Sequence, residues 1–300
     1  MDFRCPECVQ EALREQISYG AYGYNALHTR FMKAFAQWEQ TRHGCGVSLD
    51  HLRYAPGVVP AVNWCVETMT QPGDSIMTLP PVYYPFFAAV TANDRKLVLS
   101  PLRREGERYE MDFADMEEKM ISDHVRMLIF CSPHNPVGRV WTREELEKLV
   151  QLCRKHNVTI VSDEIHQDFV FAPAKHIPLM TLEPNAVTLT APSKTFNLAG
   201  MQTAVAIIPE DSLREKWDAF TKRLHLNSGS TFGYLAGEAA YLHGEAWLEE
   251  LKEFFTKKCR IALDYGTWFK GDGETFARFN LATSRENVEK AAESVISALK

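Results

Sequence analysis

Short apolar runs alternate with longer amphipathic segments between residues 75 and 190, and this alternation constrains the fold more than any other feature. The segment at 142–156 is a strong helical pattern, with acidic residues in its first turn and basic residues at its end. Continuously apolar strands separated by helices are typical of a mostly parallel sheet with both faces covered. We therefore predict a three-layer α/β sandwich. Its strands are expected at 75–78, 96–100, 125–131, 158–162 and 186–190, and its helices at 84–92, 112–121 and 142–156.

The two ends of the chain have a mainly helical pattern instead. Helical patterns precede the alternation at 5–19, 28–43 and 60–70 and follow it at 210–226 and 232–262, and a short α/β piece at 274–299 comes last. We therefore expect three parts. These are an N-terminal helical segment over 1–45, a large ligand-binding domain over 46–225, and a helical connection with a reduced C-terminal domain over 226–300.

Composition and charge exclude several classes of function. The 300-residue chain has a net charge of −6 and no block of basic residues, which argues against binding to nucleic acid or to a membrane surface. Its apolar runs stay below the roughly 18 residues that span a bilayer. The first residues lack the charged and apolar regions of a secretory signal. We therefore expect a cytoplasmic protein that acts on a small molecule.

The seven cysteines indicate free thiols in a reducing compartment. Their number is odd, and they are scattered through apolar contexts such as those of Cys65 and Cys131. Cys5 and Cys8 have the CxxC spacing of a zinc or redox site, but no second pair is evident. We expect no metal.

Polar side chains follow three of the predicted strands at the point where each strand ends. Asn135 comes after the run at 125–131, and Asp163 comes directly after the run at 158–162. Lys194 follows the run at 186–190. Because ligands bind at the carboxyl ends of strands in an open parallel sheet, an amide, a carboxylate and an amine are expected to converge at one edge.

These three groups are the ones that a pyridine-aldehyde cofactor requires. An amine such as that of Lys194 can condense with the aldehyde and later act as a base. A carboxylate such as that of Asp163 keeps the pyridine nitrogen protonated, and an amide such as that of Asn135 donates to the phenolate oxygen. A metal cluster of Asp163, Glu164 and His166 is the alternative, but no distant partner ligand is evident.

Further motifs occur in a fixed order along nearly the whole chain. Those around the three groups read NPVG from Asn135, SDEIH from Ser162 and SKTFNLAG from Ser193, and others are PGVVP at 56–60 and PPVYYPF at 80–86. Together they resemble the fold-type I, pyridoxal-phosphate (PLP)-dependent class I/II aminotransferase superfamily. Within it, the chain is most similar to the cystathionine β-lyase, or C–S lyase, branch.

The resemblance implies that Lys194 forms the Schiff base with PLP, that Asp163 binds the pyridine nitrogen and that Asn135 donates to the O3′ oxygen. It places Tyr83 in a stack on the ring, with His166 beside the ring. Lys194, Asp163 and Tyr83 are the expected catalytic residues. Packing alone is the alternative for Tyr83.

The resemblance also implies sites for the phosphate and the substrate. The phosphate is expected to bind the backbone amides of Val58 and Val59 at a helix N-terminus, the Ser193 hydroxyl, and Tyr24 from the partner subunit of a homodimer. Arg278 matches the position that binds the substrate α-carboxylate, for which a guanidinium is suited. A surface ion pair is the alternative for Arg278.

The branch implies β-elimination, in which L-cystathionine or a related cysteine S-conjugate is cleaved to a thiol, pyruvate and ammonia. Transamination of an amino acid uses the same residues up to removal of the Cα proton, so it stays open. A PLP-binding protein with weak catalysis and a regulatory role also stays open, because the chain is shorter than its relatives at the N-terminus and in the small domain. The helix expected at 245–260 passes almost directly into 261–266, where relatives have a strand pair.

Overall fold

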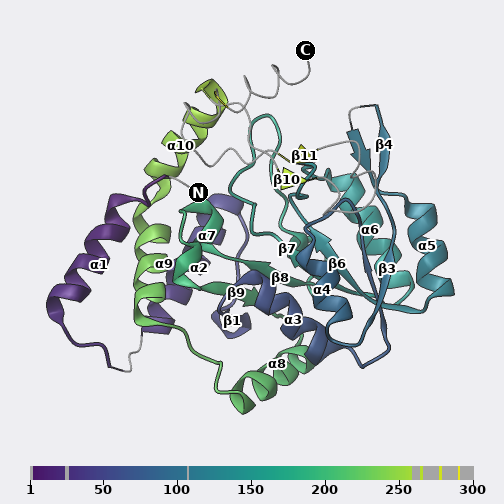
Figure 1. The fold of residues 1–300 in the computed structure, drawn as a ribbon, viewed down its shortest axis with the longest axis horizontal. Helices are drawn as coiled ribbons and strands as arrows, with labels where there is room; N and C mark the ends of the chain where they lie inside the picture. The colour runs from purple at the N-terminus through teal and green to yellow at the C-terminus, as the bar shows by residue number, and fades with distance from the viewer. Residues whose placement is uncertain are drawn as a thin grey trace.

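The computed structural model describes residues 3–23, 27–106 and 108–258, together with residues 264–265, 277–278 and 290. The strands of its main sheet are β1 (Leu52–Ala55), β2 (Ser75–Thr78), β3 (Lys96–Leu99), β6 (Val125–Cys131), β7 (Thr159–Asp163), β8 (Val187–Thr190) and β9 (Ala204–Ile207). They lie in the order β1-β9-β8-β7-β6-β2-β3 (Figure 1). The neighbouring strands β3, β2, β6, β7 and β8 are parallel to one another, and β9 is antiparallel to both of its neighbours. The predicted mostly parallel sheet is confirmed.

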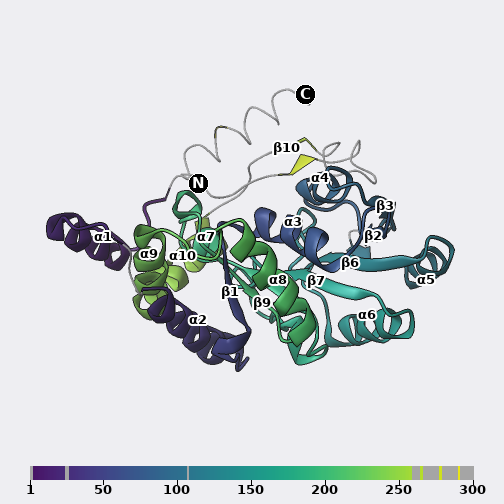
Figure 2. The ribbon, with the colours of Figure 1, turned by 90° about the horizontal axis from the view of Figure 1, so that it is seen from below.

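Helices cover both faces of the sheet because most of its strands are apolar on both sides. All residues of β2, β8 and β9 are buried. One face packs against α3 (Val58–Met69), α4 (Pro85–Thr91) and α8 (Asp211–Arg223). The other face packs against α5 (Phe113–Ser122) and α6 (Arg143–Lys155). Figure 2 shows α3 and α4 on one side of the sheet and α6 on the other, which gives the predicted three layers.

A third apolar cluster lies at the β1 and β9 end of the sheet. It joins these strands to α1 (Glu7–Tyr19), α2 (Leu27–His43) and α9 (Thr231–His243). Gly244 then separates α9 from α10 (Glu245–Lys258), so the helical pattern at 232–262 is divided into two helices. None of the helices in the described residues is long and apolar enough to cross a membrane.

Several short elements were not predicted. They are β1, β9, the hairpin of β4 (Arg103–Glu105) and β5 (Arg108–Glu110), the helix α7 (Pro192–Thr195), and the 3₁₀ turns η1 (Leu49–His51), η2 (Leu179–Thr181) and η3 (Ala199–Met201). Near the C-terminus, β10 (Asp264–Tyr265) pairs antiparallel with β11 (Ala277–Arg278). Most of the α/β piece expected at 274–299 lies outside the described residues.

Candidate functional site

The carboxyl ends of β6, β7 and β8 are level with one another. Cys131 lies opposite Asp163 across β6 and β7, and Asp163 lies opposite Leu189 across β7 and β8. The ladder continues for one more step, because Ser132 N donates to Asp163 O at 2.9 Å. Glu164 N likewise donates to Leu189 O at 2.8 Å. The loops that carry the predicted site residues therefore leave the sheet side by side.

The loop after β6 holds Asn135 in a fixed position. Asn135 is half-buried, and its backbone N–H donates to Cys131 Sγ at 3.4 Å. The neighbouring His134 is buried, and its Nε2 hydrogen-bonds to Pro81 O at 3.0 Å. Burial lowers the pKa of His134 to about 4, so this imidazole is neutral at physiological pH. The His134 contact links the Asn135 loop to the loop that carries Tyr83.

Asp163 ends β7 as a carboxyl group that is 3% exposed. Burial raises the pKa of Asp163 to about 7, and the charge of Glu164 acts in the same direction. The backbone N–H of Ile165, which donates to Asp163 Oδ1 at 3.1 Å, and the charge of Lys194 act in the opposite direction. A carboxylate has room for further hydrogen bonds, so Asp163 can bind a cationic donor at this edge.

The carboxylate of Glu164 is occupied by hydrogen bonds to other groups of the protein. It is fully buried and accepts hydrogen bonds from Ser162 Oγ at 2.8 Å and Leu179 N at 3.1 Å. His176 Nε2 lies 2.8 Å from its other oxygen. Glu164 therefore fastens the loop at 176–179 to the end of β7. No group of three or more His, Cys, Asp or Glu residues suited to a metal ion occurs in the part of the chain that the structure describes.

Lys194 lies on the short helix α7, which follows β8 directly. Pro192 and Thr195 are the buried residues of this helix, whereas Ser193 and Lys194 are half-buried. The positive charge of Lys194 acts on Asp163 and lowers the pKa of that carboxyl. An amine and a carboxyl group are thus brought within electrostatic reach across adjacent strand ends.

Helix α3 begins at the same edge. Because β1 is antiparallel to β9 and β9 is antiparallel to β8, the chain leaves β1 on the side where it leaves β8. Val58, the first residue of α3, is buried and Val59 is half-buried. The residue before the helix is Gly57, which has no side chain to cover the free N–H groups of the first turn.

Of the remaining predicted residues, the structure describes Tyr83 and His166 and the backbone of Arg278. Tyr83 is half-buried, with its ring 5.5 Å from that of Tyr84 and 5.8 Å from that of Phe86. His166 is half-buried, shortly after Asp163. Tyr24 lies outside the described residues. The backbone of Arg278 in β11 pairs with that of Asp264 in β10, but the side chain of Arg278 is outside the described part of the chain.

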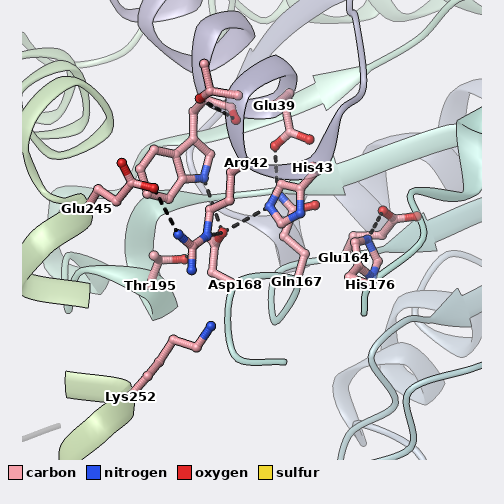
Figure 3. A network of polar contacts seen from close by, with 12 residues as sticks. Glu39, Arg42, His43, Glu164, Gln167, Asp168, His176, Thr195, Glu245 and Lys252 are labelled. Atoms are coloured by element: carbon pink, nitrogen blue, oxygen red, sulfur yellow. Dashed lines mark hydrogen bonds and ion pairs between the residues drawn. The ribbon is translucent and has the colours of Figure 1, made fainter. Parts of the chain in front are cut away.

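Sequence reasoning missed a buried polar network between α2 and α7 (Figure 3). Its centre is Asp168, which accepts a hydrogen bond from Thr195 and contacts side chains of α2. One signal was available, because Glu39, Arg42 and His43 place polar groups at helical spacing in α2. The sequence does not show that α2 and α7 meet, so the partners of this polar face were not predictable.

Comparison with known proteins agrees with this geometry. A model of the family "Aminotransferase class I and II" matches residues 1–261. The chain is 42% identical to cystathionine β-lyase PatB of Bacillus subtilis over 266 residues, which cover 87% of this chain and 69% of PatB. It is 31% identical to protein MalY of Escherichia coli, with 84% of this chain and 65% of MalY covered. The chain thus spans about two thirds of the length of these relatives.

A solved structure extends the similarity to three dimensions. Cystalysin from Treponema denticola, which contains a pyridoxal 5′-phosphate cofactor, has a TM-score of 0.90 and 30% identity to this chain. The match covers 100% of this chain and 89% of cystalysin. The resemblance and the fold class predicted from the sequence are confirmed. The chain belongs to the class I and II aminotransferase family, which is PLP-dependent.

Proposed function

We propose that this protein is a PLP-dependent C–S β-lyase that cleaves L-cystathionine or a related cysteine S-conjugate to a thiol, pyruvate and ammonia. The observation that carries the proposal is the meeting of the Asn135, Asp163 and Lys194 loops at three adjacent strand ends. Similarity to PatB, which is named a cystathionine β-lyase, supports elimination as the reaction.

The residues at this edge fit PLP. Burial disfavours the ionised form of Asp163 and raises its pKa. A protonated pyridine nitrogen would supply a positive charge that favours the ionised form. The uncovered N–H groups at the start of α3, a helix of 12 residues, suit a phosphate, and Ser193 adds a hydroxyl at the same edge. Lys194 supplies the amine for the aldehyde.

Once bound, PLP withdraws electrons from the substrate Cα and so weakens its bond to hydrogen. Lys194 has two tasks in this proposal, because its amine first holds the cofactor and then takes the Cα proton at Nζ. Asp163 would be ionised beside the protonated pyridine nitrogen and would hold it, and Asn135 would hold the cofactor through O3′. Tyr83 would pack against the cofactor, and Arg278 would orient the substrate through its α-carboxylate. Removal of the proton requires that Nζ and Cα be held at a fixed separation.

The decisive experiment measures pyruvate from L-cystathionine with PLP-loaded protein and no added keto acid. Repeated turnover is expected, because elimination needs no second substrate.

Lys194→Ala should lower kcat by roughly 100- to 10,000-fold, since it removes the base. Lys96→Ala, at a lysine that pairs with Asp123 on the surface, is the matched control and should retain activity. If L-cystathionine is consumed only when a keto acid is supplied, and yields its own keto acid in place of pyruvate, the protein is an aminotransferase. If neither cysteine conjugates nor amino acids give a product, the protein is instead a PLP-binding protein with weak catalysis and a regulatory role.

We also propose a homodimer in which Tyr24 reaches the partner's site. Three large apolar side chains are exposed at the end of α1 and just before Tyr24, namely Ile17 (59%), Tyr19 (76%) and Tyr22 (56%). Sedimentation velocity should give twice the chain mass, and Ile17→Glu should shift the protein toward monomer. Ile121→Glu, at an isoleucine of α5 that is 56% exposed, should not. A wild-type protein that sediments as a monomer at micromolar concentration would rule the dimer out.

A further inference from the structure

The helix α7 is anchored at its C-terminal end. Thr195, the residue after Lys194, is 1% exposed, and its Oγ1 donates to Asp168 Oδ2 at 2.7 Å. The next residue, Phe196, is fully buried, with its ring 5.4 Å from that of Trp38 and 6.0 Å from that of Tyr241. Lys194 therefore stands on a short helix whose end is fixed by a hydrogen bond and by an aromatic cluster.

Asp168 is the point where several elements meet (Figure 3). The side chain is 3% exposed, and three groups of α2 converge on Oδ1. Arg42 Nε and His43 Nε2 each lie 3.0 Å away, and Trp38 Nε1 donates at 3.2 Å. Burial alone would raise the pKa of Asp168, but the hydrogen bonds of His43 and Thr195 and the charge of Arg42 hold it below its ordinary value. The acceptor that binds Thr195 is thus an ionised, immobile carboxylate.

The same network reaches a further helix. Arg42 Nη2 lies 2.5 Å from Glu249 and Nη1 lies 3.5 Å from Glu245, both on α10. Asp168 is therefore held by α2, which is in turn bound to α10. A hydroxyl donated to such a carboxylate is fixed in direction, since hydrogen bonds to charged groups are shorter and stronger than neutral ones.

We propose that Asp168 is a positioning residue for Lys194. By accepting the Thr195 hydroxyl, it fixes α7 so that the Lys194 amine occupies one place at the strand ends, first against the cofactor and then against the substrate Cα. The inference rests on the proposed function, which gives Lys194 both tasks. A shift of about 1 Å in a reacting group can cost on the order of 100-fold in rate.

The test removes the hydroxyl and keeps the shape. Thr195→Val should lower kcat with L-cystathionine by roughly 10- to 100-fold, with KM within about twofold, because the base is displaced and the substrate contacts are not. Thr195→Ser restores the hydroxyl and should recover kcat to within about threefold of wild type. Thr221→Val is the matched control. Its hydroxyl is equally buried and donates to Trp217 O at 3.0 Å in α8, so its loss should affect stability and not kcat.

A second readout needs no substrate. Thr195→Val should change the visible absorption of the bound cofactor and slow borohydride fixation on Lys194, whereas Thr195→Ser and Thr221→Val should match wild type. Asp168→Asn should show the same changes, and the Asp168→Asn/Thr195→Val double variant should lose little more kcat than the single variants, because both act through one hydrogen bond.

The outcomes separate this inference from the proposed function. If borohydride does not fix the cofactor on Lys194 in the wild type, the proposed function fails and takes the inference with it. If the wild type is fixed there but Thr195→Val keeps wild-type kcat and absorption, the inference alone is wrong. Equal losses of kcat in Thr195→Val and Thr221→Val would also overturn it, because the effect would then be one of stability.

Discussion

Asp163 and Glu39 are buried carboxyl groups in which burial raises the pKa to about 7. They differ in their partners. Glu39 is 2% exposed and takes a hydrogen bond from Gln167 Nε2 at 2.6 Å within the protein. Asp163 lies at the edge where the proposed cofactor binds, and the groups that oppose the rise of its pKa are the Ile165 backbone N–H and the charge of Lys194. Similar burial thus occurs at a carboxyl group that is hydrogen-bonded by a side chain of the protein and at one that we propose binds the cofactor.

The raised pKa of Asp163 predicts how this residue makes the stability of the cofactor-free protein depend on pH. Because the folded pKa of Asp163 is raised from 3.8 to about 7, the folded state binds the proton more tightly than the unfolded state. The contribution of Asp163 to the free energy of unfolding is therefore full below pH 4 and is lost as the pH rises to about 7, on the order of a few kcal/mol. Asp163→Asn should flatten this loss when urea unfolding is measured from pH 5 to pH 8.

The exposed Asp50 provides the control, since Asp50→Asn should leave the pH dependence as in the wild type. PLP should also reduce the loss in the wild type, because a positively charged ring favours the ionised carboxylate. An Asp163→Asn variant with the same pH dependence as wild type would contradict the assignment of the raised pKa.

Two glycines, Gly237 in α9 and Gly244 directly after it, allow close packing against neighbouring aromatic rings. A Cβ on Gly237 would lie 2.5 Å from Phe31 Cε2 in α2, and a Cβ on Gly244 would lie 2.6 Å from Phe196 Cε1. The second contact is next to the helix that carries Lys194. The close packing of α2, α9 and α7 therefore makes the elements around Lys194 one connected body.

The packing predicts the result of a substitution that helix propensity alone would favour. Alanine is a better helix former than glycine by up to about 1 kcal/mol. Gly237→Ala should nevertheless lower the free energy of unfolding by roughly 1–3 kcal/mol, because Phe31 has to move. Gly200→Ala is the control, since nothing lies within 4 Å of a Cβ at that position. Urea unfolding of both variants is the measurement, and a more stable Gly237→Ala protein would contradict the packing.

Sequence patterns predicted the elements that carry their own signal. The runs at 125–131 and 158–162 are mainly apolar, with Arg126 as the one charged residue, and are followed by polar loops, so both the strands and the places of Asn135 and Asp163 could be predicted. The strand β1 could not, because it has only four residues and Arg53 interrupts their apolar pattern. The Arg53 guanidinium binds Asp218 of α8 at 2.5 Å and 2.8 Å. The pairing of β1 with β9 depends on tertiary packing. The link from Asp168 to Thr195 is of the same kind.

Over the whole molecule, the candidate site draws on residues far apart in the sequence. The start of α3 near residue 58 and the amine of Lys194 come to one edge because β1 and β8 point the same way with β9 between them. The edge is built by a seven-stranded sheet whose strands lie between Leu52 and Ile207, in a chain that spans about two thirds of PatB and MalY. We therefore predict that this chain binds PLP covalently without the part of those relatives that it does not match.

The most direct measurement is borohydride reduction of the PLP-loaded protein, followed by mass spectrometry of its peptides. We predict that the cofactor is fixed on Lys194 and that the Lys194→Ala protein is not labelled above background. Labelling spread over several lysines, or equal labelling of Lys194→Ala, would contradict the claim that the strand ends of β6, β7 and β8 form the cofactor site.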